Sequence, residues 1–265
     1  MIGVAPSYLQ PPQYYPTSNT ASRLEPLTVF CDFDGPIIDV SNRYYTTYKL
    51  ALANTQAMYQ TQGISLAIQE MSKQQFWQMK QDRVPDVEIA MRSGLQGEQI
   101  DFFLGRVLEI VNKPTLLRQD RLQPGVSWAL ALLHSHGIRL VLVTLRCQLQ
   151  ATQILRNYGL TRLFSGIYGT CNRNAAYQNQ ADVKRQLLEK AIAEQSPVTE
   201  HPNVAWMVGD TEADLLAAQA LSIPTVALTC GIRSRLYLKQ FQPTHISNDL
   251  LSAAHYLLQT IKVEK

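Results

Sequence analysis

The stretch LTVFCDFDGP, residues 27–36, decides how the rest of the chain is interpreted. Its first five residues are β-prone and almost entirely apolar, and the run stops at the polar turn residues that follow. A run of this kind predicts a strand that is buried on both faces and ends in a turn. Two carboxylates, Asp32 and Asp34, therefore stand directly after a buried strand.

Beyond this strand the pattern changes twice. Residues 42–120 show the apolar spacing of helices, and the remainder alternates between short apolar runs and helical segments. Apolar strands must be covered on both faces, and parallel neighbours need helical crossovers. We therefore predict an α/β fold with a Rossmann-like three-layer parallel sheet. The expected strands are 27–31, 138–143, 167–168, 204–208 and 225–228, and the expected helices after the insertion are 126–136, 148–157, 181–194, 212–221 and 249–261.

The same pattern divides the chain into a core and an insertion. We expect residues 26–41 and 122–265 to form the Rossmann-like catalytic core, and residues 42–121 to form an all-helical cap inserted after the first strand. Residues 1–25 are rich in Pro and Tyr and have no periodic pattern, so we expect a disordered N-terminal arm. Packing of this arm on the domain or on a partner is the alternative.

Composition and charge exclude several classes of protein. The chain has 265 residues, 46% hydrophobic and 17% charged, which suits a folded core and not a disordered chain. A net charge of +3 without basic clusters predicts no nucleic-acid and no membrane partner. The four cysteines lack the spacing of a disulfide framework or a zinc site. The cysteine pattern fits a reducing cytoplasm, so we expect a cytoplasmic protein. No apolar run approaches the roughly 20 residues that cross a bilayer, so we expect it to be soluble. Its expected oligomeric state is monomer or dimer.

Polar residues stand where the expected strands end. In parallel sheets, ligands bind at the carboxyl ends of the strands. Asp32, Asp210 and Asp214 would converge there, and three carboxylates in a partly dry crevice repel one another strongly unless a cation is present. Oxygen ligands without His or Cys fit Mg²⁺, which takes one or two carboxylates together with water and substrate phosphate. The sequence therefore predicts a magnesium site.

Four motifs carry a family resemblance. DFDG at 32–35, Thr144 after an apolar run, Lys184, and GDTEAD at 209–214 resemble, in order and spacing, the motifs of the haloacid dehalogenase superfamily. The helical insertion resembles that of the helical-cap (C1) subclass, which includes phosphoglycolate phosphatase. The resemblance covers residues 27–260. It implies a Mg²⁺-dependent phosphatase that hydrolyses a small phosphorylated metabolite through an aspartyl-phosphate.

The resemblance also implies catalytic and metal-binding roles for individual residues. Asp32 matches the family's nucleophile and Asp34 its general acid and base, and Asp34 is retained in phosphatases and mutases but not in dehalogenases. Thr144 would bind phosphoryl oxygens, and Lys184 would neutralise the nucleophile and the developing charge. The implied metal ligands are Asp32, Asp34 through its carbonyl, Asp210 and Asp214.

Substrate contacts follow less directly. The expected substrate-binding residues are Gly35, Leu145, Arg146 and, in the cap turn, Arg92, with Lys80 and Arg83 as weaker candidates. Pro36 stands where the family usually has Thr, and Leu145 replaces the usual Asn. These departures affect substrate positioning and not the groups that transfer protons.

Several alternatives stay open at this point. A phosphomutase would use the same nucleophile and return the phosphoryl group to a sugar, and a binding module would keep the fold without turnover. A receiver-like switch would keep its aspartyl-phosphate for hours. Asp214 also has the spacing of a capping box with Thr211, so a structural role competes with metal binding. The DxDG motif does not fit an EF-hand, because its glycine is too early and a strand precedes it.

Overall fold

A six-stranded parallel sheet forms the centre of the protein. The computed structural model describes residues 27–195 and 205–263. The sheet has the order β5-β4-β1-β6-β7-β8, and each neighbouring pair is parallel. Its strands are β1 (Thr28–Cys31), β4 (Arg139–Cys147), β5 (Gly166–Thr170), β6 (Ala205–Gly209), β7 (Thr225–Leu228) and β8 (His245–Ser247).

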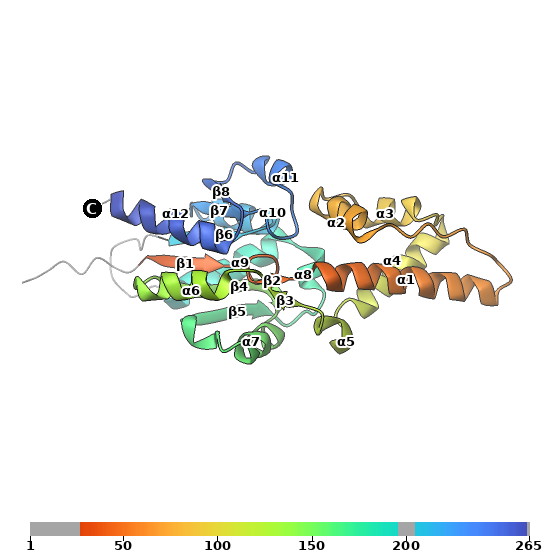
Figure 1. Ribbon diagram of the computed structural model, residues 1–265, viewed down its shortest axis with the longest axis horizontal. Coiled ribbons are helices and arrows are strands. Elements are labelled where there is room, and N and C mark those ends of the chain that lie inside the picture. The colour runs from red at the N-terminus through yellow and green to blue at the C-terminus, as the bar shows by residue number, and fades with distance from the viewer. Residues whose placement is uncertain (1–26, 196–204, 264–265) are drawn as a thin grey trace, which may run out of the picture.

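Helices cover both faces of this sheet, as Figure 1 shows. Alternate residues of β1 pack in opposite directions, because side chains along a strand point to alternating faces. Val29 and Cys31 belong to the apolar cluster that includes α6 and α12, whereas Phe30 belongs to the cluster with α9 and α10. The helices of the core are α6 (Val126–Ser135), α7 (Gln148–Asn157), α8 (Ala175–Gln178), α9 (Ala181–Gln195), α10 (Glu212–Ala220), α11 (Arg235–Lys239) and α12 (Leu250–Val263), with a 3₁₀ turn at Thr161–Leu163.

The helical insertion leaves and rejoins the sheet at one place. Strands β2 (Ile38–Asp39) and β3 (Arg121–Leu122) pair antiparallel and frame its two chain crossings. Figure 1 shows α1 to α4 grouped at the end of the elongated molecule toward which β1 points. The insertion consists of α1 (Ser41–Thr61), α2 (Lys73–Gln81), α3 (Asp86–Arg92), α4 (Glu98–Ile110) and α5 (Pro114–Leu117). This placement puts the insertion over the carboxyl ends of the strands.

The predicted fold class is confirmed, and several elements differ in extent. The strand expected to end at Val143 continues to Cys147, with a shift of register against β5, so Thr144 lies inside β4 and not after it. The short elements β2, β3, α8, α11 and β8 had too few residues to show a periodic pattern. The predicted arm 1–25 lies outside the described residues, and the core and cap boundaries stay predictions. Within the described part of the chain, every helix is too short or too polar to cross a membrane.

Candidate active site

The sheet order brings Asp32 and Asp210 together. Asp32 follows β1 and Asp210 follows β6, and these two strands are neighbours, with the amide of Asp32 donating to the carbonyl of Val208 at 2.9 Å. After β1, the strands β4 and β5 are added on one side of this pair. After β6, the strands β7 and β8 are added on the other side, so the direction of strand addition reverses between β1 and β6. A crevice forms at such a reversal of strand order, and ligands of α/β sheets bind there.

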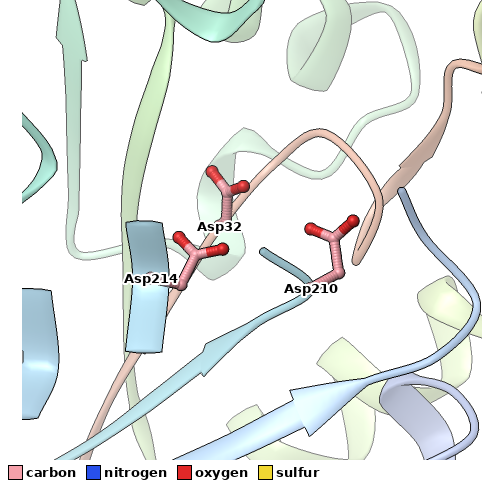
Figure 2. Close-up of side chains that lie close together, drawn as sticks. All are labelled: Asp32, Asp210 and Asp214. Atoms are coloured by element: carbon pink, nitrogen blue, oxygen red, sulfur yellow. The ribbon is translucent and has the colours of Figure 1, made fainter. Parts of the chain in front are cut away.

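Three buried carboxylates face one another at this edge of the sheet. Candidate ligand oxygens of Asp32, Asp210 and Asp214 all lie within 4.8 Å of one another. Figure 2 shows their side chains pointing toward the same space. Asp32 is 6% exposed, and the other two are fully buried. Three negative charges out of water at this spacing require a positive partner.

Lys184 is one such partner. It lies in the first turn of α9, and its Nζ is 2.8 Å from Asp32 Oδ1 and 2.6 Å from Asp214 Oδ1. Only 1% of its side chain is exposed. One ammonium against three carboxylates leaves two negative charges uncompensated within the cluster, so a divalent cation would balance its charge.

Burial and repulsion shift the ionisation of these groups. Burial raises the pKa of Asp32 to about 7, with the Lys184 charge opposing the shift and Asp214 adding to it. The pKa of Asp210 is raised well above its usual range by burial, and further by Asp214 and Asp32. For Lys184, burial alone would lower the pKa, but Asp214 and Asp32 outweigh it and raise the value. Protons and a cation would therefore compete for the same oxygens.

Asp214 has a structural role and also faces the carboxylate cluster. Its Oδ2 accepts from the amide of Thr211 at 3.1 Å and from the Thr211 hydroxyl at 2.8 Å, which fixes the first turn of α10. Its Oδ1 pairs with Lys184. The capping alternative and the functional hypothesis are thus compatible, because the two roles use different oxygens.

The Asp210 carboxylate fits a metal ligand. Its Oδ2 accepts from the amide of Ile232 at 2.5 Å. Its Oδ1 is buried and has no hydrogen-bond partner among the described residues. A buried carboxylate oxygen without a partner is costly unless a cation or water satisfies it. The donor set is all oxygen, which matches a hard cation such as Mg²⁺.

Two glycines leave room for this carboxylate. Gly35 has a φ of +98°, and a Cβ built on it would lie 2.1 Å from Asp210 Oδ2. A Cβ on Gly231 would lie 2.0 Å from the same oxygen. Gln123 links the two loops that carry these glycines, because its Nε2 donates to the carbonyls of Gly35 at 2.9 Å and Cys230 at 3.1 Å. Gly35 therefore contributes space beside Asp210.

Gly35→Ala is expected to destabilise the fold more than a positive φ alone explains, and to displace Asp210. Alanine at a left-handed position costs about 1–2 kcal/mol, and here its methyl also collides with a buried carboxylate. Gly63→Ala is the matched control, because Gly63 has a φ of +77° and open space around it. Urea unfolding measures the free energy of unfolding of each variant. An equal decrease in Gly35→Ala and Gly63→Ala would contradict the close contact between residue 35 and Asp210.

Asp34 faces a different set of partners. Its Oδ1 is 2.7 Å from Arg146 Nε, and its Oδ2 is 3.4 Å from Arg43 Nη2. Arg146, expected to contact substrate, is therefore held by Asp34, and its substrate role stays a prediction. The hydroxyl of Thr144 accepts from the Arg146 amide at 3.1 Å, and the side chain of Leu145 packs in a small apolar cluster.

Arg92 and the weaker candidates Lys80 and Arg83 lie in different places on the insertion. Arg92 is exposed and pairs with Glu88 one helical turn away, at 2.5 Å. A cavity of about 20 Å³ between insertion and core is instead lined by Lys80 and Arg83, the weaker candidates, and by Arg233. Its full lining is Tyr44, Lys80, Arg83, Ala176, Tyr177, Asn179, Thr211, Ile232 and Arg233. Arg92 lies outside this lining, and its substrate contact stays a prediction.

Ion pairs close the insertion onto the core around this cavity. Glu212 accepts from Arg83 of the insertion and from Arg233 of the core, each at 2.8 Å. Lys80 pairs with Asp86 at 2.8 Å, and the hydroxyl of Tyr177 donates to the same carboxylate at 2.7 Å. The cavity is therefore bounded by polar groups from both parts of the chain.

Comparison with known proteins agrees with this geometry. The family model of haloacid dehalogenase-like hydrolases matches residues 29–228, which span the sheet from β1 to β7 and the whole insertion. The chain belongs to this family. The resemblance seen in the four motifs is thereby confirmed.

Individual relatives of this hydrolase are distant. A phosphoglycolate phosphatase from Agrobacterium fabrum (strain C58) is 24% identical over 249 residues, covering 91% of this chain and 96% of the relative. A haloacid dehalogenase-like hydrolase from Streptococcus pneumoniae has a similar structure, with a TM-score of 0.62 and 21% identity over 87% of this chain and 97% of its own. A predicted phosphoglycolate phosphatase from Haemophilus somnus has a TM-score of 0.57 and 19% identity, over 90% and 97%. The structural likenesses confirm the fold.

The hydrolase contains charged residues at the site that the sequence analysis missed. Arg43 and Asp120 are buried beside Asp34 and Arg146, and Arg233 lines the cavity. A signal for Arg43 exists, because a cation in the first turn of a helix opposes the helix dipole and calls for a nearby anion. Asp120 and Arg233 lie in short connections without such a signal.

Proposed function

We propose that this hydrolase is a Mg²⁺-dependent phosphomonoesterase that forms a phosphoryl intermediate on Asp32. The observation that carries the proposal is the convergence of Asp32 with Lys184, Asp210 and Asp214 at the carboxyl ends of β1 and β6. A nucleophilic carboxylate, a fixed ammonium and an acidic set suited to a divalent cation are the groups that phosphoryl transfer requires.

The proposed reaction has two steps. In the first, an oxygen of Asp32 attacks phosphorus, the bond from phosphorus to the ester oxygen breaks, and Asp34 gives a proton to the departing alkoxide. In the second, Asp34 takes a proton from water, which attacks the same phosphorus and releases inorganic phosphate from Asp32. Lys184 neutralises charge on Asp32 throughout, and Thr144 with the Leu145 amide binds phosphoryl oxygens.

The proposed metal ligands are the carboxylates of Asp32, Asp210 and Asp214 and the backbone carbonyl of Asp34. When bound, Mg²⁺ would supply charge stabilisation for the phosphoryl oxygens and the attacking carboxylate. The fit rests on the unpartnered Oδ1 of Asp210 and on the negative excess of the cluster.

Mg²⁺ is expected to raise the melting temperature more at about pH 8 than at about pH 5, because protons and the cation compete for the same carboxylates. The pKa of Asp32 rises from 3.8 to about 7 on folding in the absence of metal. The raised pKa means that this group's contribution to stability is complete below pH 3.8 and is lost as the pH rises through about 7. Bound Mg²⁺ restores stability in the upper range, where the carboxylates are ionised. Thermal unfolding with Mg²⁺ or with EDTA, across this pH range, measures the effect.

Two variants control this measurement. Asp210→Asn should remove most of the Mg²⁺-dependent rise in melting temperature. Asp101→Asn should keep it, because Asp101 is an exposed carboxylate on α4. A rise that is equal at all pH values, or that survives in Asp210→Asn, would contradict the proposed metal site.

The substrate that we propose is a small phosphomonoester with a second anionic group. Lys80, Arg83 and Arg233 line a cavity between insertion and core that has room for about one water molecule, so a ligand could reach these cations only if the insertion moved away from the core. The acids paired with these cations are Asp86 and Glu212. Three cations against two acids favour an anionic ligand. The name of the Agrobacterium relative makes 2-phosphoglycolate the first compound to test.

A panel of phosphorylated metabolites tests the proposal directly. Phosphate release with Mg²⁺ present is expected to be fastest for small phosphorylated carboxylic acids, and neutral sugar phosphates should react more slowly. Accumulation of an isomerised sugar phosphate without phosphate release would favour a mutase. Failure to release phosphate from every compound, including p-nitrophenyl phosphate, would overturn the proposed function.

A further inference from the structure

Asp34 is part of a closed ring of four charged side chains. Arg43 spans two carboxylates, with Nη2 3.4 Å from Asp34 Oδ2 and Nε 2.9 Å from Asp120 Oδ1. Arg146 spans the same two carboxylates, with Nε 2.7 Å from Asp34 Oδ1 and Nη2 2.7 Å from Asp120 Oδ2. Each carboxylate oxygen therefore faces one guanidinium group. Asp120 touches both of the arginines that touch Asp34.

The ring is buried and electrically balanced. The side chains of its four members are between 2% and 6% exposed. Two guanidinium groups offset two carboxylates, so the ring as a whole is neutral while Asp34 is ionised, the state in which Asp34 takes a proton from water in the second proposed step. Three of the four contacts are charge-assisted hydrogen bonds, and the contact of Arg146 Nε with Asp34 Oδ1 is an ion pair. Such buried contacts resist rearrangement, because each broken pair leaves a charge without compensation. The ring can thus fix the orientation of the Asp34 side chain.

The ring also joins the two crossings between insertion and core. Arg43 lies in the first turn of α1, just after the first crossing, and Asp120 directly precedes β3 at the second. Arg43 has a further contact in the insertion, donating to Asn112 Oδ1 at 3.1 Å. Asp34 and Arg146 belong to the core, two residues after Asp32 and Thr144 respectively. Asp120 is therefore well placed to act on Asp34 without belonging to the carboxylate cluster.

We propose that Asp120 is a positioning residue, which holds Arg43 and Arg146 on the two oxygens of Asp34 and so directs that carboxyl group toward the leaving oxygen of the substrate. The proposal rests on the proposed function, in which Asp34 protonates the departing group. The Asp120 side chain accepts hydrogen bonds from the two arginines that hold Asp34, so its effect on the reaction is transmitted through them. Its loss should reduce proton delivery and leave the attack by Asp32 intact.

The dependence of the hydrolysis rate on the leaving group distinguishes a loss of proton delivery from a general loss of activity. Phenyl phosphate and p-nitrophenyl phosphate have similar shapes, but phenoxide is the more basic leaving group and depends more on a proton donor. The readout is the ratio of kcat/KM for p-nitrophenyl phosphate to kcat/KM for phenyl phosphate. This ratio does not depend on the fraction of folded enzyme, so partial unfolding of a variant cancels.

Asp120→Asn is expected to raise this ratio roughly tenfold, part of the hundredfold or greater effect of a general acid, and Asp34→Asn should raise it further. Asp120→Glu, which restores the charge, should return the ratio toward the wild-type value. Asp86→Asn is the matched control, because Asp86 also pairs with a buried cation of the insertion but does not contact Asp34. Its ratio should equal that of the wild type even if its activity falls.

The outcomes separate this inference from the proposed function. If the wild type hydrolyses both esters and the ratio in Asp120→Asn is unchanged, the positioning role is overturned and the phosphatase stands. A ratio that rises equally in Asp86→Asn would also overturn it. If Asp120→Asn yields no folded protein, Arg43→Lys answers the same question, because lysine keeps the charge but cannot span both carboxylates. A wild type that hydrolyses neither ester would instead contradict the proposed function.

Discussion

Asp32→Asn is expected to lower kcat for hydrolysis of p-nitrophenyl phosphate by about 10⁴-fold or more, the scale on which removal of a nucleophile acts in covalent catalysis. The amide keeps the shape of the side chain but lacks the anionic oxygen that attacks phosphorus. It also loses the charged contact with Lys184, which now lies 2.8 Å from Asp32 Oδ1. Release of p-nitrophenolate at saturating Mg²⁺ measures the loss.

The variant should remain folded, which separates lost chemistry from lost structure. Burial raises the pKa of Asp32 to about 7, so the ionised form is disfavoured in the folded protein without metal. An uncharged amide removes repulsion against Asp210 and Asp214, and this gain offsets part of the lost pairing with Lys184. The melting temperature in EDTA should therefore stay close to that of the wild type.

Asp101→Asn is the matched control for this substitution, since it makes the same chemical change at an exposed position on α4. Its kcat should equal that of the wild type. Substantial turnover by folded Asp32→Asn would contradict a phosphoryl intermediate on this residue. Acid-quenched enzyme gives a second test, because radiolabelled phosphate should remain attached to the wild type and be absent from Asp32→Asn.

The positions of Asp32 and Asp210 could be predicted because each follows an apolar run of the length of a buried strand. Parallel topology brings the carboxyl ends of such strands to one edge, so the sequence is enough to place the two carboxylates near each other. Lys184 could be predicted for a different reason. An ammonium in the first turn of a helix is unfavourable to the helix dipole, so its presence indicates a nearby anion.

Pairings formed by burial between distant segments could not be predicted. The ring around Asp34 joins the turn after β1, strand β4 and both crossings of the insertion, and no periodic pattern links them. Arg92 shows the converse case. The cap-turn resemblance favours a substrate contact for Arg92, which stays a prediction, and the sequence alone did not indicate that Glu88, one helical turn earlier, pairs with it at the surface. Lys80 on α2, Arg83 just after α2 and Arg233 of the core meet at the cavity because of how the insertion packs against the core.

The extent of β4 illustrates a limit of the apolar pattern. The run predicted to end at Val143 is followed by Thr144 and Arg146, which are polar yet buried in the observed strand. Their burial is offset by hydrogen bonds and ion pairs, because Arg146 reaches two carboxylates and Thr144 accepts an amide. Functional sites break the apolar pattern at the places where charges are brought together, so strand ends near them are the hardest to predict.

Lys184→Met is expected to lower both stability and activity strongly. Removing one partner of a buried ion pair costs about 3–5 kcal/mol, because the remaining charges lose their compensation. Here Lys184 pairs with Asp32 and Asp214, and 1% of its side chain is exposed. The variant would leave three carboxylates without a cation in the absence of metal. Urea unfolding in EDTA should therefore show a large decrease in the free energy of unfolding.

Mg²⁺ should restore part of this stability but little of the activity, since the cation can balance charge without taking the place of the ammonium beside Asp32. Lys190→Met is the matched control, because Lys190 lies on the same helix, is 63% exposed and faces Glu194 at 3.9 Å. A surface pair of this kind contributes about 0–1 kcal/mol, so this control should keep nearly all its stability and turnover.

If Lys184→Met unfolds at the same urea concentration as Lys190→Met, or hydrolyses p-nitrophenyl phosphate at a similar rate, the ammonium has no part in balancing the carboxylate cluster. A selective loss at Lys184 would establish that the cluster needs two sources of positive charge, one fixed in the fold and one supplied by the metal.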